Sequence, residues 1–419
     1  MFKLLKRSHP TPPRSAPAAF PGRFDLLWLL LALLLLAGAF SAYRSGRYCA
    51  YLATDFRGYY SSAQIARRFG FAGVYDQPLQ NAFQAALPYR CPDGALVPPP
   101  LRVSVPYLPV FTALFLPLPA LDFTSAYQAW SVLHLAALVF YSQRFARGLA
   151  GGTGGLRLLQ WALCVPMLAN LVLGQMNVLL VICLGEFVLA WRGGRARCSG
   201  LWLCGLLIKP HTLLLLLPAL LAGRRWGVLA GFLAGLAGVL GLSLLLGGAA
   251  GVRGVLGVVQ DFAAPSFLTA PAMMNWRALA LNLTPLLPAW VAWGIAGLGM
   301  AGVTLLVLQL WRVPLHPERT VLLVAVTYAA TCTVAWHANI YLLLPLLPLL
   351  LALDIKGTLP AFSLPAWTFG PPLVFALAYL ARPDLARAWF GLGLLAMNVG
   401  FVAWGARRLL ERDEDLQAV

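Results

Sequence analysis

The sequence predicts an all-α, polytopic membrane protein. Of its 419 residues, 60% are hydrophobic and only 11% are charged, and the mean hydropathy is +0.77. Apolar runs such as 26–40, 226–246 and 342–353 approach or exceed the ~20 residues that a helix needs to cross a bilayer. The runs lack the alternation of a membrane β-barrel, so helices are the remaining way to satisfy the backbone in lipid. We therefore expect one membrane domain over residues 26–410.

The charge of the chain points to membrane lipids as partners rather than to nucleic acid. The formal net charge is +17, but the basic residues are scattered at the ends of the apolar runs, where orientation signals and lipid headgroups both use Lys and Arg. No nucleic-acid recognition motif accompanies them. The 7 cysteines show no spacing typical of a metal site, so we expect none. Cys49 and Cys91 share one predicted loop, where a disulfide between them is an open alternative.

Both ends of the chain are predicted to be cytoplasmic. Residues 1–25 are basic and precede the first apolar run, which is the arrangement that the positive-inside rule places in the cytoplasm. A cleavable signal peptide is the alternative, because Ala37-Gly38-Ala39 resembles a cleavage site. The tail, 411–419, follows the last predicted span.

An external loop over about 43–102 follows the first apolar helix and carries two predicted helices. The second of them, 79–87, is the shorter. In the first, apolar and aromatic residues recur at helical spacing with polar residues between them, which is typical of a helix on the membrane surface. Its apolar positions are Tyr59, Tyr60, Ala63, Ala66 and Phe69, and its polar positions are Arg57, Gln64 and Arg67.

The remaining spans leave two topologies open. Twelve simple crossings place arginines near 144–157 and 192–197 outside, against the positive-inside rule. We favour ten crossings, in which 104–120 dips in and returns and 199–222 doubles back at Lys209-Pro210, because proline disfavours helix at the residue before it. The predicted spans are 104–121, 123–143, 156–172, 175–192, 199–222, 226–247, 287–311, 319–335, 338–353, 365–381 and 388–408, with a second external loop over about 248–284.

Asp55 is the strongest candidate for chemistry, because so few charged groups are available in this chain. It opens the first predicted external helix, where an aspartate also serves well as an N-cap. A carboxylate at the membrane face can instead act as a general base towards a hydroxyl. The sequence alone leaves both roles open.

Lys209 places a charge within an apolar stretch, which is costly and calls for a partner. It either snorkels to an interface or provides a fixed positive charge beside a phosphate. Gln175 and Asn177 belong to a polar break between two spans, which serves a tight turn or orients a polar ligand. His337 and Arg277 are further candidates at the external side, although a lone histidine is more often structural.

In their order these residues resemble the polyprenol-phosphate-mannose-dependent mannosyltransferases of glycosyltransferase family 87, in the glycosyltransferase-C superfamily. The likeness covers about residues 25–355. Four stretches carry it: Asp55-Phe56 with Tyr59-Tyr60, Ala63 and Tyr75-Asp76; Pro106-Tyr107 with Pro109; Asn170, Gly174-Gln175-x-Asn177, Gly200, Gly205, Lys209-Pro210, Pro218 and Arg224-Arg225-Trp226; and Trp336-His337 with Tyr341.

The resemblance implies a glycosyltransferase-C-like bundle of about 10–12 transmembrane or re-entrant helices in a bacterial-type plasma (inner) membrane. It implies transfer of a hexose, expected to be mannose, from a polyprenyl-phosphate donor to a hydroxyl of a glycolipid or cell-envelope acceptor outside the cytoplasm, with inversion. Asp55 would be the base, and no cofactor or metal is implied beyond the lipid-linked sugar. Donor phosphate or substrate contacts would come from Lys209, His337, Tyr59, Tyr60, Arg67, Arg68, Gln175, Asn177 and Arg277.

Two other classes of protein stay open from the residues alone. A transporter or flippase of lipid-linked sugars usually shows repeated halves with paired broken helices, whereas this sequence shows one break, at Lys209-Pro210. A non-catalytic membrane scaffold would not need an acid, a lysine and a histidine on one face.

Overall fold

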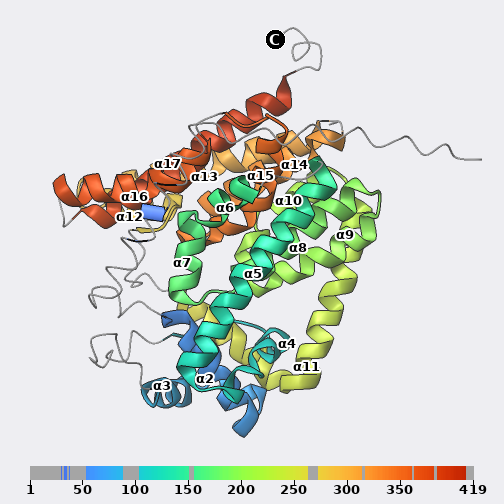
Figure 1. Cartoon of the computed structure of the whole chain (residues 1–419), viewed down its shortest axis with the longest axis vertical. Coiled ribbons are helices and arrows are strands. Elements are labelled where there is room, and N and C mark those ends of the chain that lie inside the picture. The colour runs from blue at the N-terminus through green and yellow to red at the C-terminus, as the bar shows by residue number, and fades with distance from the viewer. Residues whose placement is uncertain are drawn as a thin grey trace, which may run out of the picture.

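A computed structural model describes residues 53–87, 103–150, 155–262, 272–313, 317–360, 363–381 and 385–411, with separate positions between 30 and 37. Within these residues the chain is all-helical, which confirms the predicted fold class (Figure 1). The basic N-terminal segment, most of the first apolar run, both loop cysteines and the tail after residue 411 lie outside the described residues. Among the described residues three helices are long and apolar enough to cross a membrane, so this is an integral membrane protein: Trp226–Gln260, Ala289–Arg312 and Ala386–Leu410.

The first described helix, α2 (Thr54–Phe69), packs at one end of the bundle, with η2 (Phe71–Tyr75) and α3 (Gln77–Ala85) beside it (Figure 1). Most of its expected apolar face is buried, whereas Phe69 at its end is 57% exposed. However, Arg57, which the helical pattern places on the polar face, is only 1% exposed, with its guanidinium carbon 5.9 Å from the Phe123 ring. The prediction of a surface helix is therefore wrong for its first turns, because protein covers both faces there.

Residues 103–121 supply much of that cover and do not cross the bundle. They run through short turns named α4 (Pro109–Thr112), η3 (Ala113–Phe115) and η4 (Leu118–Ala120). The beginning of the stretch is tied to α3, since Gln84 Nε2 donates to Val103 O at 2.8 Å. Its end is tied to α2, since Tyr60 OH donates to Leu121 O at 2.8 Å. Both ends thus lie on the α2 side of the molecule, as expected of a segment that dips in and returns.

Helix α5 (Phe123–Ala150) runs from α2 through the bundle (Figure 1). Asp122 caps it, because its Oδ1 accepts from Thr124 N at 3.0 Å and Ser125 N at 3.1 Å. Aromatic packing fixes α2 against this helix. The Phe56 ring lies between 5.5 and 6.0 Å from the rings of Phe123, Tyr127 and Trp130.

The chain then passes up and down the bundle through α6 (Gly155–Ala162), α7 (Val165–Leu173) and α8 (Asn177–Arg192), and it doubles back at Lys209. The segment before the break comprises α9 (Ala196–Leu203) and η5 (Cys204–Ile208), and the segment after it comprises η6 (Pro210–Leu213) and α10 (Leu216–Ala222). The end of α10 returns to the end of α8, where the Arg225 guanidinium carbon lies 5.6 Å from the Trp191 ring centre. The 199–222 stretch is thus a pair of antiparallel arms.

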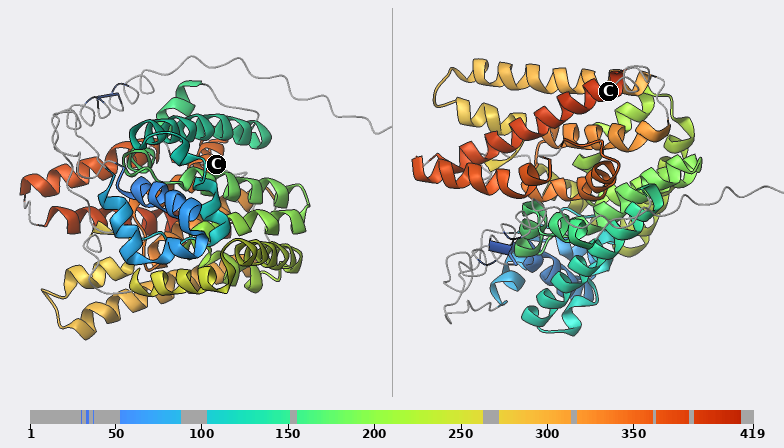
Figure 2. Two further views of the ribbon diagram at one scale, coloured as in Figure 1. Left: turned by 90° about the horizontal axis from the view of Figure 1, so that it is seen from below. Right: turned by 45° about the horizontal axis from the view of Figure 1, so that its top comes forward.

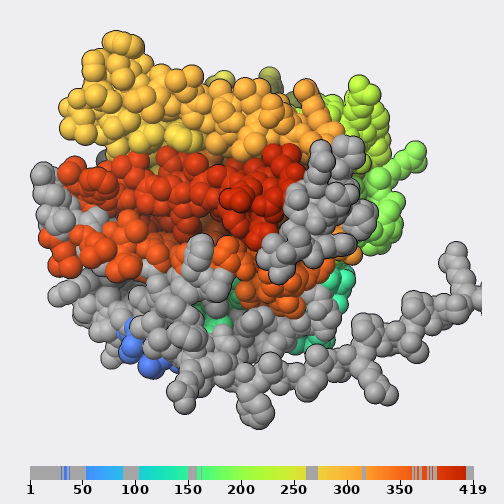
Figure 3. All heavy atoms as spheres, turned by 90° about the horizontal axis from the view of Figure 1, so that it is seen from above, coloured from blue at the N-terminus to red at the C-terminus, as the bar shows by residue number. Residues whose placement is uncertain are grey.

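The C-terminal half contributes α11 (Trp226–Phe262), α12 (Trp276–Leu283), α13 (Ala289–Arg312), η8 (Pro317–Arg319), α14 (Thr320–Val334), η9 (Ile340–Leu346), α15 (Leu347–Ile355), α16 (Ser363–Ala381) and α17 (Ala386–Leu410). Helix α11 packs against η2 and α4, and it lies beside the blue N-terminal helices in the left view of Figure 2. Figure 3 shows α13 and α17 as parallel bands on one face. Helix α11 kinks at Gly248, whose φ is 61°, and continues to residue 262. Much of the stretch assigned to a second external loop, 248–284, is therefore helical.

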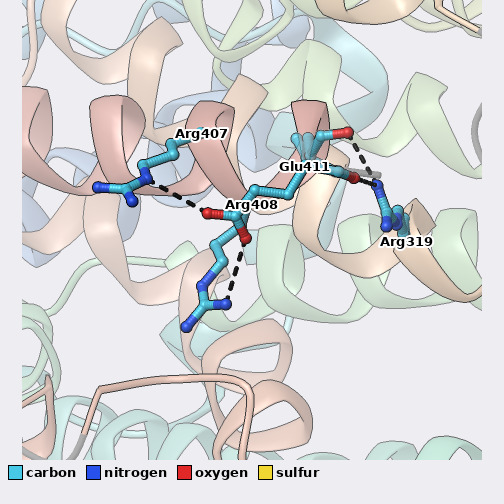
Figure 4. Close-up of polar contacts among 5 residues, drawn as sticks. Arg319, Arg407, Arg408 and Glu411 are labelled. Atoms are coloured by element: carbon cyan, nitrogen blue, oxygen red, sulfur yellow. Dashed lines mark hydrogen bonds and ion pairs between the residues drawn. The ribbon is translucent and has the colours of Figure 1, made fainter. Parts of the chain in front are cut away.

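Arginines gather at the end of the bundle remote from α2. Arg319 Nη1 donates to Leu409 O at 3.0 Å and to Glu411 O at 2.8 Å, and this contact joins the start of α14 to the end of α17 (Figure 4). Arg407 and Arg408 both contact the Glu411 carboxylate at 3.2 Å. This end includes Arg192, Arg195, Arg197, Arg224, Arg225, Arg312, Arg319, Arg407 and Arg408.

A glycine substitution tests whether the close approach of α2 to the α7–α8 turn holds this fold together. Gly174 has a φ of 70°, and a Cβ there would lie 2.5 Å from the Phe56 Cβ. We expect Gly174→Ala to lower the free energy of unfolding by at least about 2 kcal/mol, from backbone strain and overpacking. The check is the apparent melting temperature of the purified protein in detergent.

Gly238→Ala is the matched control, because this glycine lies inside α11 and a Cβ there meets no atom within 4 Å. Its effect should be neutral or stabilising by up to ~1 kcal/mol, since alanine favours helix. Equal melting temperatures for the two variants would contradict the predicted close packing at Gly174.

Candidate active site

The turn between α7 and α8 is held from several directions. Gly174 adopts the left-handed conformation that ends α7, and Gln175 N donates to Asn170 O at 2.8 Å. The Asn170 side-chain oxygen accepts from Asn177 N at 3.1 Å and from Asn177 Nδ2 at 3.0 Å. From α5, Trp130 Nε1 donates to Gly174 O at 3.0 Å. These contacts fix the position of Gln175 before any ligand binds.

Asp55 reaches this turn from the first turn of α2. The helix begins after Ala53, whose φ of 55° is unusual for a residue with a Cβ, and whose N–H donates to Val172 O at 2.7 Å. The N-cap position is thus taken by Ala53, without a side-chain hydrogen bond, so Asp55 does not cap the helix. Its Oδ2 instead accepts a hydrogen bond from Gln175 Nε2.

Lys209 reaches the same glutamine from the opposite direction. It lies at the break between η5 and η6, and Thr212 Oγ1 donates to the Lys209 carbonyl at 2.7 Å. The side chain is 6% exposed, and its Nζ donates to Gln175 Oε1 at 2.6 Å. The Nζ also lies 4.7 Å from the centre of the Tyr341 ring, in a cation–π contact.

The Gln175 carboxamide therefore bridges a carboxylate and an ammonium group. Its Nε2 faces Asp55, and its Oε1 accepts from Lys209 and from Tyr59 OH, the latter at 3.1 Å. Tyr59 OH also lies 3.1 Å from Tyr107 OH. Burial raises the pKa of Tyr59 well above its ordinary value, so this hydroxyl keeps its proton and serves as a donor.

Burial also raises the pKa of Asp55, and two smaller effects oppose it: the charge of Lys209 and the hydrogen bond from Gln175. A raised pKa makes the Asp55 carboxylate a stronger base than an aspartate in water. The side chain is partly exposed, whereas Gln175 is 4% exposed. A substrate can therefore reach the Asp55 carboxylate directly.

A second polar group adjoins Lys209 at residues 335–341. The His337 and His211 rings have centroids 6.4 Å apart. Burial, and then the charges of Lys209 and Arg277, lower the pKa of His337 to about 4. Asn339 Nδ2 donates to His337 Nε2 at 3.2 Å, which fits a neutral imidazole whose Nε2 is an acceptor.

Arg277 is held beside this group by the start of α12. Asn275 caps that helix through Ala278 N at 2.9 Å and donates to Ala335 O at 2.9 Å. The Arg277 guanidinium carbon lies 4.1 Å from the Trp336 ring centre, and its Nη1 donates to Trp336 O at 3.4 Å. Arg277 is thus a buried cation near the Lys209 side of the site.

The structure brings together only part of the predicted site. Asp55, Tyr59, Gln175 and Lys209 are in contact through one amide, with His337 and Arg277 adjacent to Lys209. The remaining predicted residues do not contact Asp55. Tyr60 OH donates to Leu121 O, and the Asn177 side chain donates to Asn170. Arg67 and Arg68 lie on the last turn of α2, ~18 Å from Asp55 along the helix.

Three residues of the observed site escaped the sequence prediction of binding residues, namely Tyr107, His211 and Tyr341. The available signals were weak: Tyr107 follows a proline, His211 lies two residues after Lys209, and Tyr341 lies near His337. Tyr107 contacts Tyr59, the Tyr341 ring lies at Lys209, and His211 lies beside His337. These placements depend on how segments distant in sequence pack together. As for metals, the described part of the chain contains no group of three or more His, Cys, Asp or Glu side chains suited to holding an ion.

Comparison with known proteins gives one match. The chain matches none of the curated proteins and none of the solved structures with which it was compared. Residues 106–337, more than half of the chain, match glycosyltransferase family 87. The matched residues include Gln175, Lys209 and His337, whereas Asp55 precedes them. This protein therefore belongs to glycosyltransferase family 87 and is an integral-membrane glycosyltransferase.

Proposed function

We propose that this enzyme transfers a hexose, with mannose as the expected sugar, from a polyprenyl-phosphate donor to an acceptor hydroxyl at the extracytoplasmic face. The acceptor is a glycolipid or another cell-envelope molecule. One observation carries the proposal: Gln175 holds a base, Asp55, and a buried cation, Lys209, on the two ends of one amide. Glycosyl transfer from a phosphate donor needs both groups close to the same sugar.

In the proposed reaction the Asp55 carboxylate takes the proton of the acceptor hydroxyl as the oxygen attacks the anomeric carbon. The bond from that carbon to the phosphate oxygen breaks on the opposite face, and the electron pair leaves with the polyprenyl phosphate. A single displacement of this kind inverts the anomeric configuration. Lys209 stabilises the charge on the departing phosphate, which removes the need for a separate general acid.

Gln175 would keep the two charged groups apart until the donor binds. In the structure Gln175 Oε1 accepts a hydrogen bond from the Lys209 ammonium group and a second one from Tyr59 OH. A phosphate oxygen is a stronger partner for an ammonium group than an amide oxygen, so the donor would replace Gln175 at Lys209. The Gln175 Nε2 would go on orienting the Asp55 carboxylate.

Further donor contacts would come from Arg277 and His337. Arg277 contributes a second positive charge on the Lys209 side, and neutral His337 contributes a hydrogen bond. Arg67 and Arg68 are left out of the proposed donor site because they lie at the far end of α2.

The distribution of arginines supports the proposed side of the membrane. They gather at the end of the bundle opposite the bridge, and the positive-inside rule assigns that end to the cytoplasm. Asp55 and Lys209 then face outward, where a lipid-linked donor presents its sugar while its chain stays in the bilayer.

Removal of the base tests the role of Asp55. We expect Asp55→Asn to lower kcat by about 100- to 10,000-fold, because the proton acceptor is lost while the shape of the side chain is kept. The assay follows labelled mannose from a polyprenyl-phosphate donor into a lipid extract of the producing cells. Asp122→Asn is the matched control, since asparagine caps α5 as well as aspartate does. Undiminished transfer by Asp55→Asn would show that another group is the base.

Removal of the cation tests the role of Lys209. Lys209→Met keeps the length of the side chain but removes the charge, so we expect the donor KM to rise by about tenfold or more. Lys356→Met, at an exposed lysine after α15, should leave the donor KM unchanged. A donor KM unaffected by Lys209→Met would exclude a phosphate-binding role.

The pH profile tests the coupling between the two charges. Asp55 works only when ionised, so kcat/KM should fall as the pH falls through its raised pKa. The charge of Lys209 lowers that pKa, so its removal raises it, and the acid limb of Lys209→Met should move to higher pH than in the wild type. Lys356→Met should not move the limb. If the acid limb of Lys209→Met stayed in place or moved to lower pH, the charge of Lys209 would not lower the pKa of the group that titrates.

A further inference from the structure

A cavity of about 710 Å³ opens at the arginine-rich end of the bundle, remote from Asp55. It lies between the α10–α11 turn and the end of α13. Its lining contains three arginines and neither aspartate nor glutamate, and consists of Leu221, Ala222, Gly223, Arg224, Arg225, Trp311, Arg312 and Val313. This concentration of positive charge in a concave site is not needed for the transfer reaction.

Arg225, the least exposed arginine of this basic pocket, is held by aromatic packing, whereas Arg224 and Arg312 are exposed. The Arg225 guanidinium lies over Trp191 at 5.6 Å, and Trp191 stacks on Trp311 with ring centroids 5.1 Å apart. Within the described part of the chain, the buried Nε of Arg225 has no hydrogen-bond partner. The positive-inside rule accounts for arginines at this end, but not for a buried donor left without an acceptor.

The backbone at Arg224 turns sharply where α10 ends and α11 begins. Its φ of 52° lies in the left-handed region, which residues with a Cβ rarely adopt. Two hydrogen bonds hold this conformation at the end of α10: Arg225 N donates to Leu220 O at 2.9 Å, and Arg224 N donates to Leu221 O at 3.0 Å. The turn places two consecutive arginines, Arg224 and Arg225, just before α11 in the lining of the pocket.

The rim of the pocket matches a lipid rather than a soluble anion. Leu221 and Val313, which line the pocket, are 51% and 37% exposed, and Trp226, which follows Arg225, is 62% exposed. Exposed apolar side chains therefore adjoin the arginines. Guanidinium groups bind phosphate oxygens in a fork geometry, and tryptophan favours the headgroup level of a bilayer. Charged headgroup and apolar chain would thus meet complementary surfaces side by side.

We propose that this basic pocket binds the headgroup of an anionic phospholipid. The phosphodiester contacts Arg224, Arg225 and Arg312, and the acyl chains lie against Leu221 and Trp226. Anionic lipids concentrate in the cytoplasmic leaflet, at which the arginine-rich end is expected to lie. Helix α10 leads from this pocket to Lys209, so a bound lipid would anchor the arm that carries the donor-binding lysine to α13.

Native mass spectrometry of the full-length protein in detergent tests the proposal, with phosphatidylglycerol and phosphatidylcholine of identical acyl chains as probes. The wild type should retain phosphatidylglycerol preferentially, and Arg224→Gln/Arg225→Gln/Arg312→Gln should reduce that preference by about tenfold or more. The matched control, Arg147→Gln/Arg195→Gln/Arg197→Gln, removes the same charge from exposed positions outside the pocket and should keep the preference. Equal loss in both variants, or displacement of the lipid by millimolar inorganic phosphate, would overturn the proposal.

Arg224→Gly keeps the test decisive if the triple variant does not fold. Glycine adopts a positive φ without strain, so this variant should melt at a higher temperature than the wild type when no anionic lipid is present. It should also retain less phosphatidylglycerol, because one phosphate-binding group is gone. Unchanged phosphatidylglycerol retention in a stabilised Arg224→Gly would contradict the pocket assignment.

Discussion

The site depends on one amide, the side chain of Gln175. Asp55 lies in the first turn of α2, and Lys209 lies at the break between the two antiparallel arms. Both side chains form a hydrogen bond with the same carboxamide. An amide can donate to a carboxylate with one end and accept from an ammonium group with the other, which no charged side chain could do here. The contacts of Asn170, Trp130 and Gly174 at the α7–α8 turn serve to hold that amide in place.

The broken arms around Lys209 follow from the cost of placing a charge in an apolar bundle. A buried ammonium group is tolerated only with partners, and Lys209 has Gln175 Oε1, the Tyr341 ring and the nearby charge of Asp55. Pro210 ends the first arm, and Thr212 bonds the carbonyl that the break exposes. The same break returns the chain to the arginine-rich end, so the reacting groups and the basic pocket lie at opposite ends of the molecule.

Much of this could be predicted from the sequence, because few residues in so apolar a chain can carry chemistry. The fold class followed from the apolar runs, and the break at Lys209-Pro210 followed from a proline beside a costly charge. The resemblance assigned Asp55, Gln175 and Lys209 to one site, but their direct contact through the Gln175 amide did not follow from spacing, since Asp55 and Gln175 lie 120 residues apart in sequence. The burial of Arg57 was missed for a similar reason: the 103–121 segment and α5 cover a face that the helical pattern assigns to solvent.

A suitable charge, or a place near Asp55 or Gln175 in the sequence, does not by itself bring a side chain to the site. Arg67 and Arg68 share a helix with Asp55, but the rise of an α-helix carries them ~18 Å away. Asn177 shares a polar turn with Gln175, but its amide bonds Asn170 within that turn. Conversely, Tyr107 and Tyr341 could not be found by helical periodicity, because they lie on an extended segment and at the start of a 3₁₀ turn.

The central claim is that Asp55 and Lys209 act on one donor molecule. It is tested most directly by an experimental structure of the protein with a polyprenyl-phosphate sugar bound. We expect the donor phosphate at Lys209 Nζ in place of Gln175 Oε1, with the anomeric carbon between that phosphate and the Asp55 carboxylate. A phosphate bound instead at Arg67 and Arg68, or a sugar beyond the reach of Asp55, would contradict it.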